Sequence, residues 1–219
     1  MKTFFKKYSH AWLLSYFFIY MIWFFVLENR MVTSVTYLHS PLDNLIPFQE
    51  WFVIPYFLWF PYLFIGIGYL FLKDAREFYQ LGAMLAIGLT VCLLIYTIWP
   101  NGQMLRPATF ARNNICTRIV RWLYAFDTPT NVCPSIHVYN SLVVHIALWR
   151  SRHLKNRPYI RYGSLILTFL ICASTVFLKQ HSIIDGICAI ILSIIMYGFV
   201  YVLYPQLRHC KKETGGAGF

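Results

Sequence analysis

Six long apolar segments, separated by polar stretches, constrain this chain more than any other feature of its sequence. They lie near the length of about 20 residues that a helix needs to cross the hydrocarbon core of a membrane. Backbone N–H and C=O groups must find partners inside the membrane, so such segments fold as helices. We predict an all-α fold, a six-span transmembrane helical bundle, with spans at residues 11–27, 52–72, 81–99, 135–149, 162–178 and 183–204. The 135–149 segment is short and carries polar residues, so we expect it to lie against other helices rather than lipid.

The composition supports a membrane protein. Of the 219 residues, 58% are apolar and only 12% are charged, whereas soluble domains carry about 25% charged residues. The length suits a single integral membrane domain over residues 1–212, followed by a flexible tail over 213–219. The net charge of +11 could indicate a nucleic-acid partner. The basic residues cluster between the apolar segments, however, as membrane topology requires, so we expect no nucleic-acid binding.

The distribution of Lys and Arg predicts how the bundle is oriented. Six spans place both termini on one side, and short loops rich in Lys and Arg stay in the cytoplasm. Both termini are therefore expected in the cytoplasm of a multi-pass protein of the plasma (cytoplasmic) membrane. This orientation leaves only six of the 19 basic residues on the outer side: Arg30, Arg106, Arg112, Arg118, Arg121 and Lys179.

The longest connection in the chain, residues 100–134, falls on the outer side. A long loop in a compact protein is usually functional or disordered, and this one has too many aromatic and apolar residues for disorder. Within it, Ile119, Leu123 and Phe126 are spaced against Arg118 and Arg121. The pattern predicts a short interfacial helix over residues 115–126.

The stretch from Lys179 to Asp185 carries ionisable residues between two apolar segments. If it begins a helix, His181 and Asp185 stand four residues apart on one face, where their side chains can meet. A carboxylate on one ring nitrogen fixes the tautomer and leaves the other nitrogen free as a nucleophile or base. Ionisable groups at membrane depth are costly, which favours a functional role. The alternative is an interfacial histidine beside a solvated charge at a helix start.

Two further polar clusters fall at the outer ends of spans, on the same face as His181. The first contains Gln103 and Arg106, whose guanidinium is a permanent, forked cation of the kind that binds phosphate. The second contains Ser135, at the start of a predicted helix, where free N–H groups and the hydroxyl can hold an anion. His137 follows within one turn. The coincidence of these clusters predicts a single site at the outer surface.

These residue types indicate phosphoryl transfer. His181 would attack a phosphorus atom while Asp185 stabilises the developing imidazolium, and His137 would protonate the leaving oxygen and then activate water. The sequence contains no cluster of carboxylates that could bind magnesium, so we expect neither a metal nor another cofactor.

Three motifs resemble, in their order and spacing, those of the type 2 phosphatidic acid phosphatase superfamily. They are Arg-Pro at residues 106–107, Pro-Ser-x-His at 134–137 and His-x-x-x-Asp at 181–185. The resemblance covers about residues 95–190. It implies six spans, an outward-facing site and a lipid phosphate of the outer leaflet as the substrate.

The resemblance also implies a role for each motif residue. His181 would be the nucleophile that forms a phosphohistidine, Asp185 its partner, and His137 the general acid. Arg106 and Ser135, with the amides beside Ser135, would bind the phosphate.

The sequence departs from the family at two cations. The family's phosphatases usually carry a Lys seven residues before the Arg of Arg-Pro and an Arg six residues before the nucleophile; here these positions hold Trp99 and Thr175. Lys179 and Gln103 are candidate substitutes in substrate binding. The alternatives are a lysine that snorkels to the membrane interface and a solvated loop amide.

Branches of the superfamily that also lack these cations include sphingolipid phosphotransferases, such as the inositol phosphorylceramide and sphingomyelin synthases. In those enzymes a lipid hydroxyl takes the place of water. The sequence thus predicts first a metal-independent phosphatase, a phosphoric monoester hydrolase acting on lipid phosphates. A lipid phosphotransferase and a non-catalytic membrane scaffold or transporter stay as alternatives.

The six Cys residues include no CxxC pair and no Cys/His metal spacing, so no zinc site is expected. Cys116 and Cys133 both fall in the long outer loop, in an oxidising compartment if the topology holds. Two alternatives follow: a disulfide between them, which would close the segment that leads into Ser135, or two separate thiols.

Overall fold

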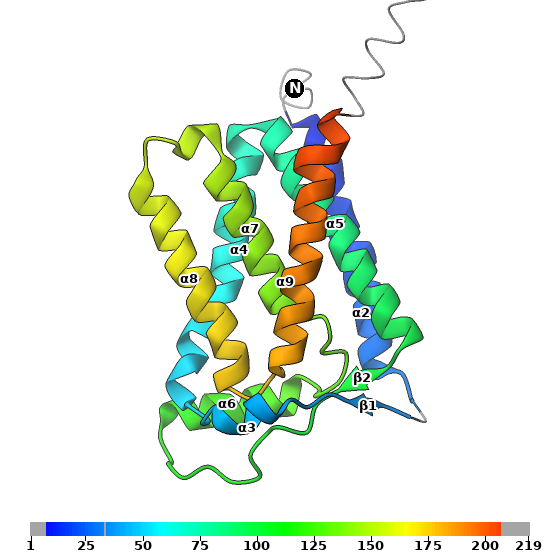
Figure 1. Ribbon diagram of the computed structural model, residues 1–219, viewed down its shortest axis with the longest axis vertical. Helices are drawn as coiled ribbons and strands as arrows, with labels where there is room; N and C mark the ends of the chain where they lie inside the picture. Colours follow the sequence, from blue (N-terminus) through cyan, green and yellow to red (C-terminus); the bar gives the residue numbers. More distant parts are fainter. Residues whose placement is uncertain (1–7, 33, 207–219) are drawn as a thin grey trace, which may run out of the picture.

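The computed structural model describes residues 8–32 and 34–206. This part is all-helical apart from two very short strands, which confirms the predicted all-α class (Figure 1). The predicted flexible tail over 213–219 lies outside the described residues. The elements are, in order, η1 (Ser9–Ser15), α2 (Tyr16–Asn29), β1 (Thr36–Tyr37), α3 (Pro41–Leu45), η2 (Glu50–Phe52), α4 (Val53–Lys73), α5 (Ala75–Ile98), β2 (Asn101–Gly102), α6 (Ile115–Phe126), α7 (Ile136–Arg150), η3 (Arg152–Leu154), α8 (Pro158–Phe177), α9 (Ile183–Tyr197) and the π-helix η4 (Gly198–Leu203).

Within the described residues, five helical segments are long and apolar enough to cross a membrane, which is compatible with a multi-pass membrane protein. Each overlaps one of the predicted spans. Their outward faces carry large apolar side chains, such as Phe64 and Phe169, which are 81% and 70% exposed. Such faces suit contact with lipid, because lipid tails are as apolar as these side chains. The segments are His10–Asn29, Glu50–Lys73, Ala75–Ile98, Pro158–Phe177 and Ile183–Gln206.

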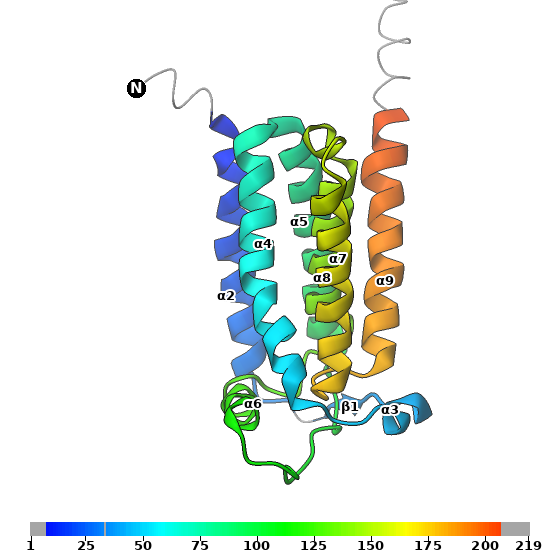
Figure 2. The same cartoon turned by 90° about the vertical axis from the view of Figure 1, so that its left-hand side faces the viewer.

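Helix α7 lies at the centre of the bundle and contacts α4, α5, α8 and α9 (Figures 1 and 2). Nine of its 15 residues are buried, and they include the polar Asn140 and Ser141. The sequence predicted that the 135–149 segment would pack against other helices because it is short and partly polar, and the packing agrees. The other helices shield α7 from lipid. With only 15 residues it does not join the five candidate spans, so the sixth span stays a prediction.

The contact between α5 and α7 depends on a glycine. The Tyr139 side chain is fully buried and its hydroxyl donates to the Met84 carbonyl at 2.6 Å. It crosses α5 at Gly88, where an added Cβ would lie 1.8 Å from the Tyr139 hydroxyl oxygen. Small residues at such crossings let membrane helices approach closely.

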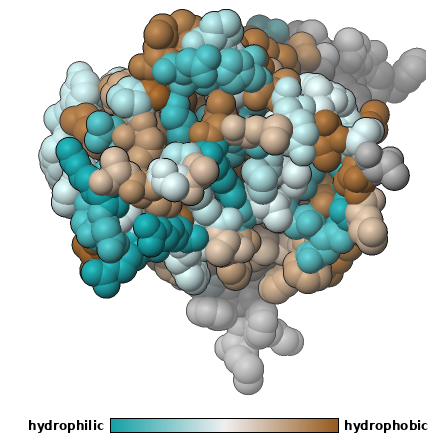
Figure 3. Space-filling view, turned by 90° about the horizontal axis from the view of Figure 1, so that it is seen from below, coloured by the Kyte–Doolittle hydropathy of each residue, from teal (hydrophilic) through white to brown (hydrophobic). Residues whose placement is uncertain are grey.

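Short elements cover one end of the bundle. Helices α3 and α6 and the strands β1 and β2 lie across the lower end, while residues 8 and 206, the ends of the described chain, lie at the upper end (Figures 1 and 2). Strands β1 and β2 pair in parallel, with Thr36 opposite Asn101. Seen from below, this end mixes hydrophilic and hydrophobic side chains (Figure 3). We call it the capped end. The predicted interfacial position of α6 remains a prediction.

Candidate active site

The loop between α8 and α9 positions His181. Helix α8 ends at Phe177, and Lys179 then takes a left-handed backbone, with φ of 53°. This turns the chain back, so that the N–H groups of Gln180 and His181 both donate to the Thr175 carbonyl at 3.0 Å. His181 therefore precedes α9 directly, at the capped end of the bundle.

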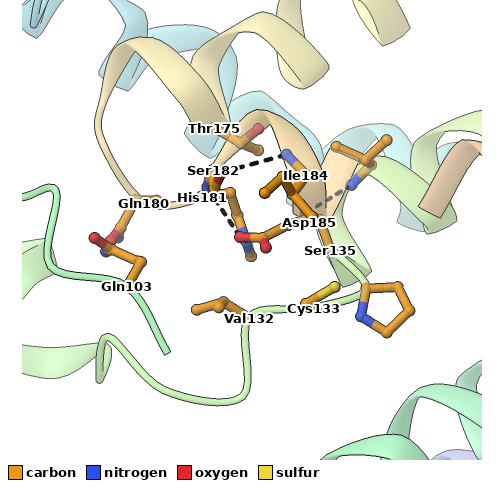
Figure 4. A network of polar contacts seen from close by, with 12 residues as sticks. Gln103, Val132, Cys133, Ser135, Thr175, Gln180, His181, Ser182, Ile184 and Asp185 are labelled. Atoms are coloured by element: carbon orange, nitrogen blue, oxygen red, sulfur yellow. Dashed lines mark hydrogen bonds and ion pairs between the residues drawn. The ribbon is translucent and has the colours of Figure 1, made fainter. Parts of the chain in front are cut away.

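Asp185 joins His181 to the start of α9. It stands at the third helical position, and its Oδ2 accepts the Ser182 main-chain N–H at 2.9 Å, completing a capping box. The same oxygen lies 3.2 Å from His181 Nδ1 (Figure 4). The Asp185 side chain is fully buried, and that of His181 is 9% exposed. The pair meets as its four-residue spacing predicts, through Nδ1 of His181 and not through Nε2.

His137 faces this pair from the first turn of α7. Its ring centroid lies 5.8 Å from that of His181, and rings of α4 flank it on the other sides, Tyr56 at 4.6 Å and Trp59 at 4.4 Å. The starts of α7 and α9 are also joined directly, because the Ser135 N–H donates to the Asp185 carbonyl at 3.1 Å. The structure thus brings the three predicted catalytic residues together.

Arg106 lies beside this group but is held by protein contacts. Its Nη1 donates to the main-chain carbonyls of Tyr124 and Asp127 at 3.1 and 2.9 Å, and its Nη2 donates to Gln180 Oε1 at 2.5 Å. The guanidinium also lies over the Tyr124 ring, 4.5 Å from the centroid. Burial lowers the pKa of Arg106 and raises that of Asp127, and the attraction between the two charges offsets part of each shift. Phosphate binding by Arg106 would require it to exchange some of these contacts.

The three other predicted substrate ligands make contacts within the fold. Ser135 is fully buried, and its hydroxyl accepts the Val138 N–H as the N-cap of α7. Gln103, 1% exposed rather than solvated, donates to the Lys179 carbonyl at 2.9 Å and accepts the Leu105 N–H. These contacts favour a structural role for the hydroxyl and the amide.

Lys179 is likewise directed at main-chain acceptors. Its Nζ donates to the carbonyls of Asp43 and Ile46, at 2.6 and 2.5 Å, which lie in and just after α3. Burial lowers the pKa of this ammonium, and the Asp43 charge partly offsets the shift. The backbone before His181 is non-helical, and the ammonium anchors α3 instead of reaching for the histidines.

Sequence reasoning missed Asp43. Its carboxylate is 1% exposed and accepts hydrogen bonds from the Ser182 hydroxyl at 2.6 Å and the Ile183 N–H at 2.9 Å. Asp43 also completes a capping box with Ser40 at the start of α3. The Ser-x-x-Asp spacing could have predicted that capping box. No local pattern could have predicted the contact with Ser182.

Asn101 is the second residue that was missed. It is fully buried, and its Oδ1 accepts the N–H groups of Val132 and Cys133 at 2.9 and 2.8 Å, while its Nδ2 donates to the Cys133 carbonyl. Asn131 has a positive φ of 55° and donates to Glu28. Asn101 is thus the side chain that directly holds the segment before Ser135.

The cysteines in the outer loop are not joined. Cys116 and Cys133 are both free and buried, so the alternative of a disulfide between them is wrong for this structure. Cys116 packs in a cluster with Val120 and Leu123 of α6, whereas the Cys133 thiol contacts Cys188 of α9. Burial raises the pKa of the Cys133 thiol. The alternative of two separate thiols therefore holds.

One group of side chains within residues 8–32 and 34–206 has metal-ligand atoms within 4.8 Å of one another: Asp74, Glu77 and His153. It lies at the start of α5, at the opposite end of the bundle from His181 (Figure 1). Arg152 forms ion pairs with both carboxylates, at 3.0 and 3.6 Å. A metal ion there would have to displace a cation that already pairs with both carboxylates.

Comparisons with known proteins assign no activity. No family model and no solved structure matches the chain. The chain is similar to an uncharacterized protein of Methanocaldococcus jannaschii, with 28% identity over 167 residues. The match covers 74% of this chain and 63% of that protein, so the chain spans less than two thirds of its relative's length. The function is therefore argued from the site itself.

Proposed function

We propose that this protein is a six-span membrane enzyme that hydrolyses a lipid phosphate through a phosphohistidine, without a metal. The observation that carries the proposal is the contact of His181 Nδ1 with the buried carboxylate of Asp185, with the ring of His137 5.8 Å away. A carboxylate on Nδ1 fixes the proton there and leaves Nε2 unprotonated, which is the form needed for attack.

The proposed reaction has two steps. Nε2 of His181 attacks the phosphorus atom, the bond from phosphorus to the lipid oxygen breaks, and His137 gives that oxygen a proton. Water then attacks the phosphohistidine and gives a proton to His137, and the N–P bond breaks to release inorganic phosphate. Asp185 stabilises the positive charge that develops on the His181 ring in the first step.

We further propose that α7 is the sixth span and that the capped end faces away from the cytoplasm. The basic loop between α7 and α8, which contains Arg152, Lys155 and Arg157, supports the opposite end as the cytoplasmic one. Both termini would then be cytoplasmic, in the plasma membrane, and the substrate would be a lipid phosphate of the outer leaflet.

The test uses purified protein in neutral detergent with a chelator. It is incubated with phosphatidate, phosphatidylglycerophosphate or a polyprenyl diphosphate, and free phosphate is measured. We expect release from at least one lipid, and a loss on the order of a thousandfold or more in His181→Ala and His137→Ala. Asp185→Asn should also lower the rate severely, since it upsets the His181 tautomer. His39→Ala, an exposed histidine at the same end of the bundle, is the matched control and should keep the wild-type rate.

A lipid phosphotransferase is the second candidate. Trp99 and Thr175 occupy the positions where the phosphatases that this chain resembles carry cations. Here Trp99 Nε1 donates to Thr36 Oγ1 at 3.1 Å, and the Thr175 carbonyl holds the His181 loop. Adding a lipid with a free hydroxyl, such as diacylglycerol or ceramide, separates the two functions. A new phospholipid in place of free phosphate would identify the transferase.

A further inference from the structure

A pocket of about 210 Å³ lies at the end of the bundle opposite the two histidines. It opens between the start of α5, the last turn of α7 and the π-helix η4. Three arginines line it, Arg76, Arg150 and Arg152, with the amide of Gln80 and a single carboxylate, Glu77. The pocket has no part in the proposed reaction.

Arg150 is oriented by two tyrosines of the last helix. Its Nη1 donates to the Tyr197 hydroxyl at 2.7 Å, and its guanidinium lies over the Tyr201 ring, 4.7 Å from the centroid. The hydrogen bond uses one of the five N–H donors that a guanidinium offers. Tyr201 lines the pocket as well, so the remaining donors of Arg150 are held at its wall.

Arg152 is paired with the carboxylates beside the pocket. Its Nη2 lies 3.0 Å from Asp74 Oδ2 and its Nε 3.6 Å from Glu77 Oε1, while its main-chain N–H donates to the same Glu77 oxygen at 3.0 Å. The Arg76 guanidinium makes no ion pair or hydrogen bond with the described residues. Arg76 and Arg150 therefore line one hollow without an ion pair to the described carboxylates, and the three arginines outnumber the carboxylates Asp74 and Glu77.

We propose that this pocket binds the phosphate group of an anionic ligand, either the headgroup of an acidic phospholipid or free phosphate. Two forked guanidinium groups and an amide can together donate hydrogen bonds to several oxygens of one ligand. A phosphate offers more such oxygens than a carboxylate ligand does. The pocket lies where candidate spans end, and basic pockets between such helices bind acidic lipid headgroups.

Native mass spectrometry of the full chain in neutral detergent tests the lipid source. Phosphatidylglycerol and, separately, phosphatidylcholine are added in increasing amounts, and the fraction of protein with one bound lipid is measured. We expect a preference for phosphatidylglycerol that falls roughly fivefold in Arg76→Gln and in Arg150→Gln, the size expected for one cation facing an acidic lipid. Because the Arg76 guanidinium makes no hydrogen bond or ion pair with the described residues, Arg76→Gln should fold normally. Lys155→Gln, an exposed cation at the same end, should leave binding unchanged.

Thermal unfolding tests the free-phosphate source. Sodium phosphate is compared with sodium chloride at equal ionic strength, with the same three variants. A rise in the unfolding temperature with phosphate that is lost in Arg76→Gln and kept in Lys155→Gln supports free phosphate as a ligand. The proposal is overturned if neither ligand binds, or if Lys155→Gln weakens binding as much as Arg76→Gln does.

Discussion

The Asp43 carboxylate lies 2.6 Å from the Ser182 hydroxyl, although 139 residues separate them in the chain. Asp43 belongs to α3, which lies across the capped end, and Ser182 is the N-cap of α9, directly after His181. The nucleophile proposed here therefore stands on a segment that is held from two sides, by Asp185 within its own helix and by Asp43 from outside it.

Replacement of Asp43 tests this outside support. Asp43→Ala would leave the Ser182 hydroxyl and the Ile183 and Ser40 N–H groups without their acceptor, at a cost of about 2–3 kcal/mol of unfolding free energy. We expect the unfolding temperature to fall by about 5–10 °C in detergent and the phosphatase rate to fall with it. Asn44→Ala, an exposed neighbour on α3, is the control. Equal unfolding temperatures for the two variants would show that Asp43 gives no support.

Replacement of Lys179 distinguishes two roles for this residue, a substrate ligand and an anchor of α3. If Lys179 were a ligand that neutralises the phosphate, Lys179→Met would cut turnover by on the order of a hundredfold and leave the fold intact. Its contacts with the Asp43 and Ile46 carbonyls predict the other pattern. The unfolding temperature should fall, and KM at permissive temperature should stay within about twofold of wild type, because uniform substrate binding is not lost. A stable Lys179→Met protein with a strongly raised KM would restore the ligand hypothesis.

The crossing of α5 and α7 predicts a strong effect of one methyl group. In Gly88→Ala the new Cβ would meet the buried Tyr139 ring, which cannot move without giving up its bond to Met84. We expect the free energy of unfolding to fall by about 1–3 kcal/mol or more. Gly163→Ala on α8 is the matched control, because nothing lies within 4 Å of its added Cβ. Denaturant unfolding of both variants in detergent measures the difference, and equal stabilities would contradict the close packing.

The proposed orientation is tested by labelling single cysteines in a background without the native ones. Met104, 77% exposed at the capped end, and Asn156, exposed in the loop between α7 and α8, are suitable positions. In intact cells an impermeant thiol reagent should modify Met104→Cys and leave Asn156→Cys unmodified until the cells are opened. The reverse pattern would place the site in the cytoplasm.

The sequence predicted what depends on local patterns. Apolar length predicted the five candidate spans, and the polar residues of the 135–149 segment predicted that it would lie inside the bundle. The spacing of His181 and Asp185 predicted their contact. What it missed depends on contacts between distant segments. Gln103, Lys179 and Arg106 were assigned to a ligand by residue type, but folding places main-chain carbonyls beside all three. Asn101 looked like part of a plain loop, and its role in holding the turn before α7 appears only once the loop is folded.

The most direct test of the account is detection of the covalent intermediate on His181. His137→Ala protein is mixed with p-nitrophenyl phosphate, whose leaving group needs little protonation, and is quenched in alkali, where phosphohistidine is stable. The account predicts a burst of about one p-nitrophenol per protein, because water is no longer activated for the second step. Mass spectrometry should then find phosphate on His181, and none in a variant that also carries His181→Ala. Absence of phosphate from His181, in this variant and in a wild-type protein given lipid phosphates, would contradict the account.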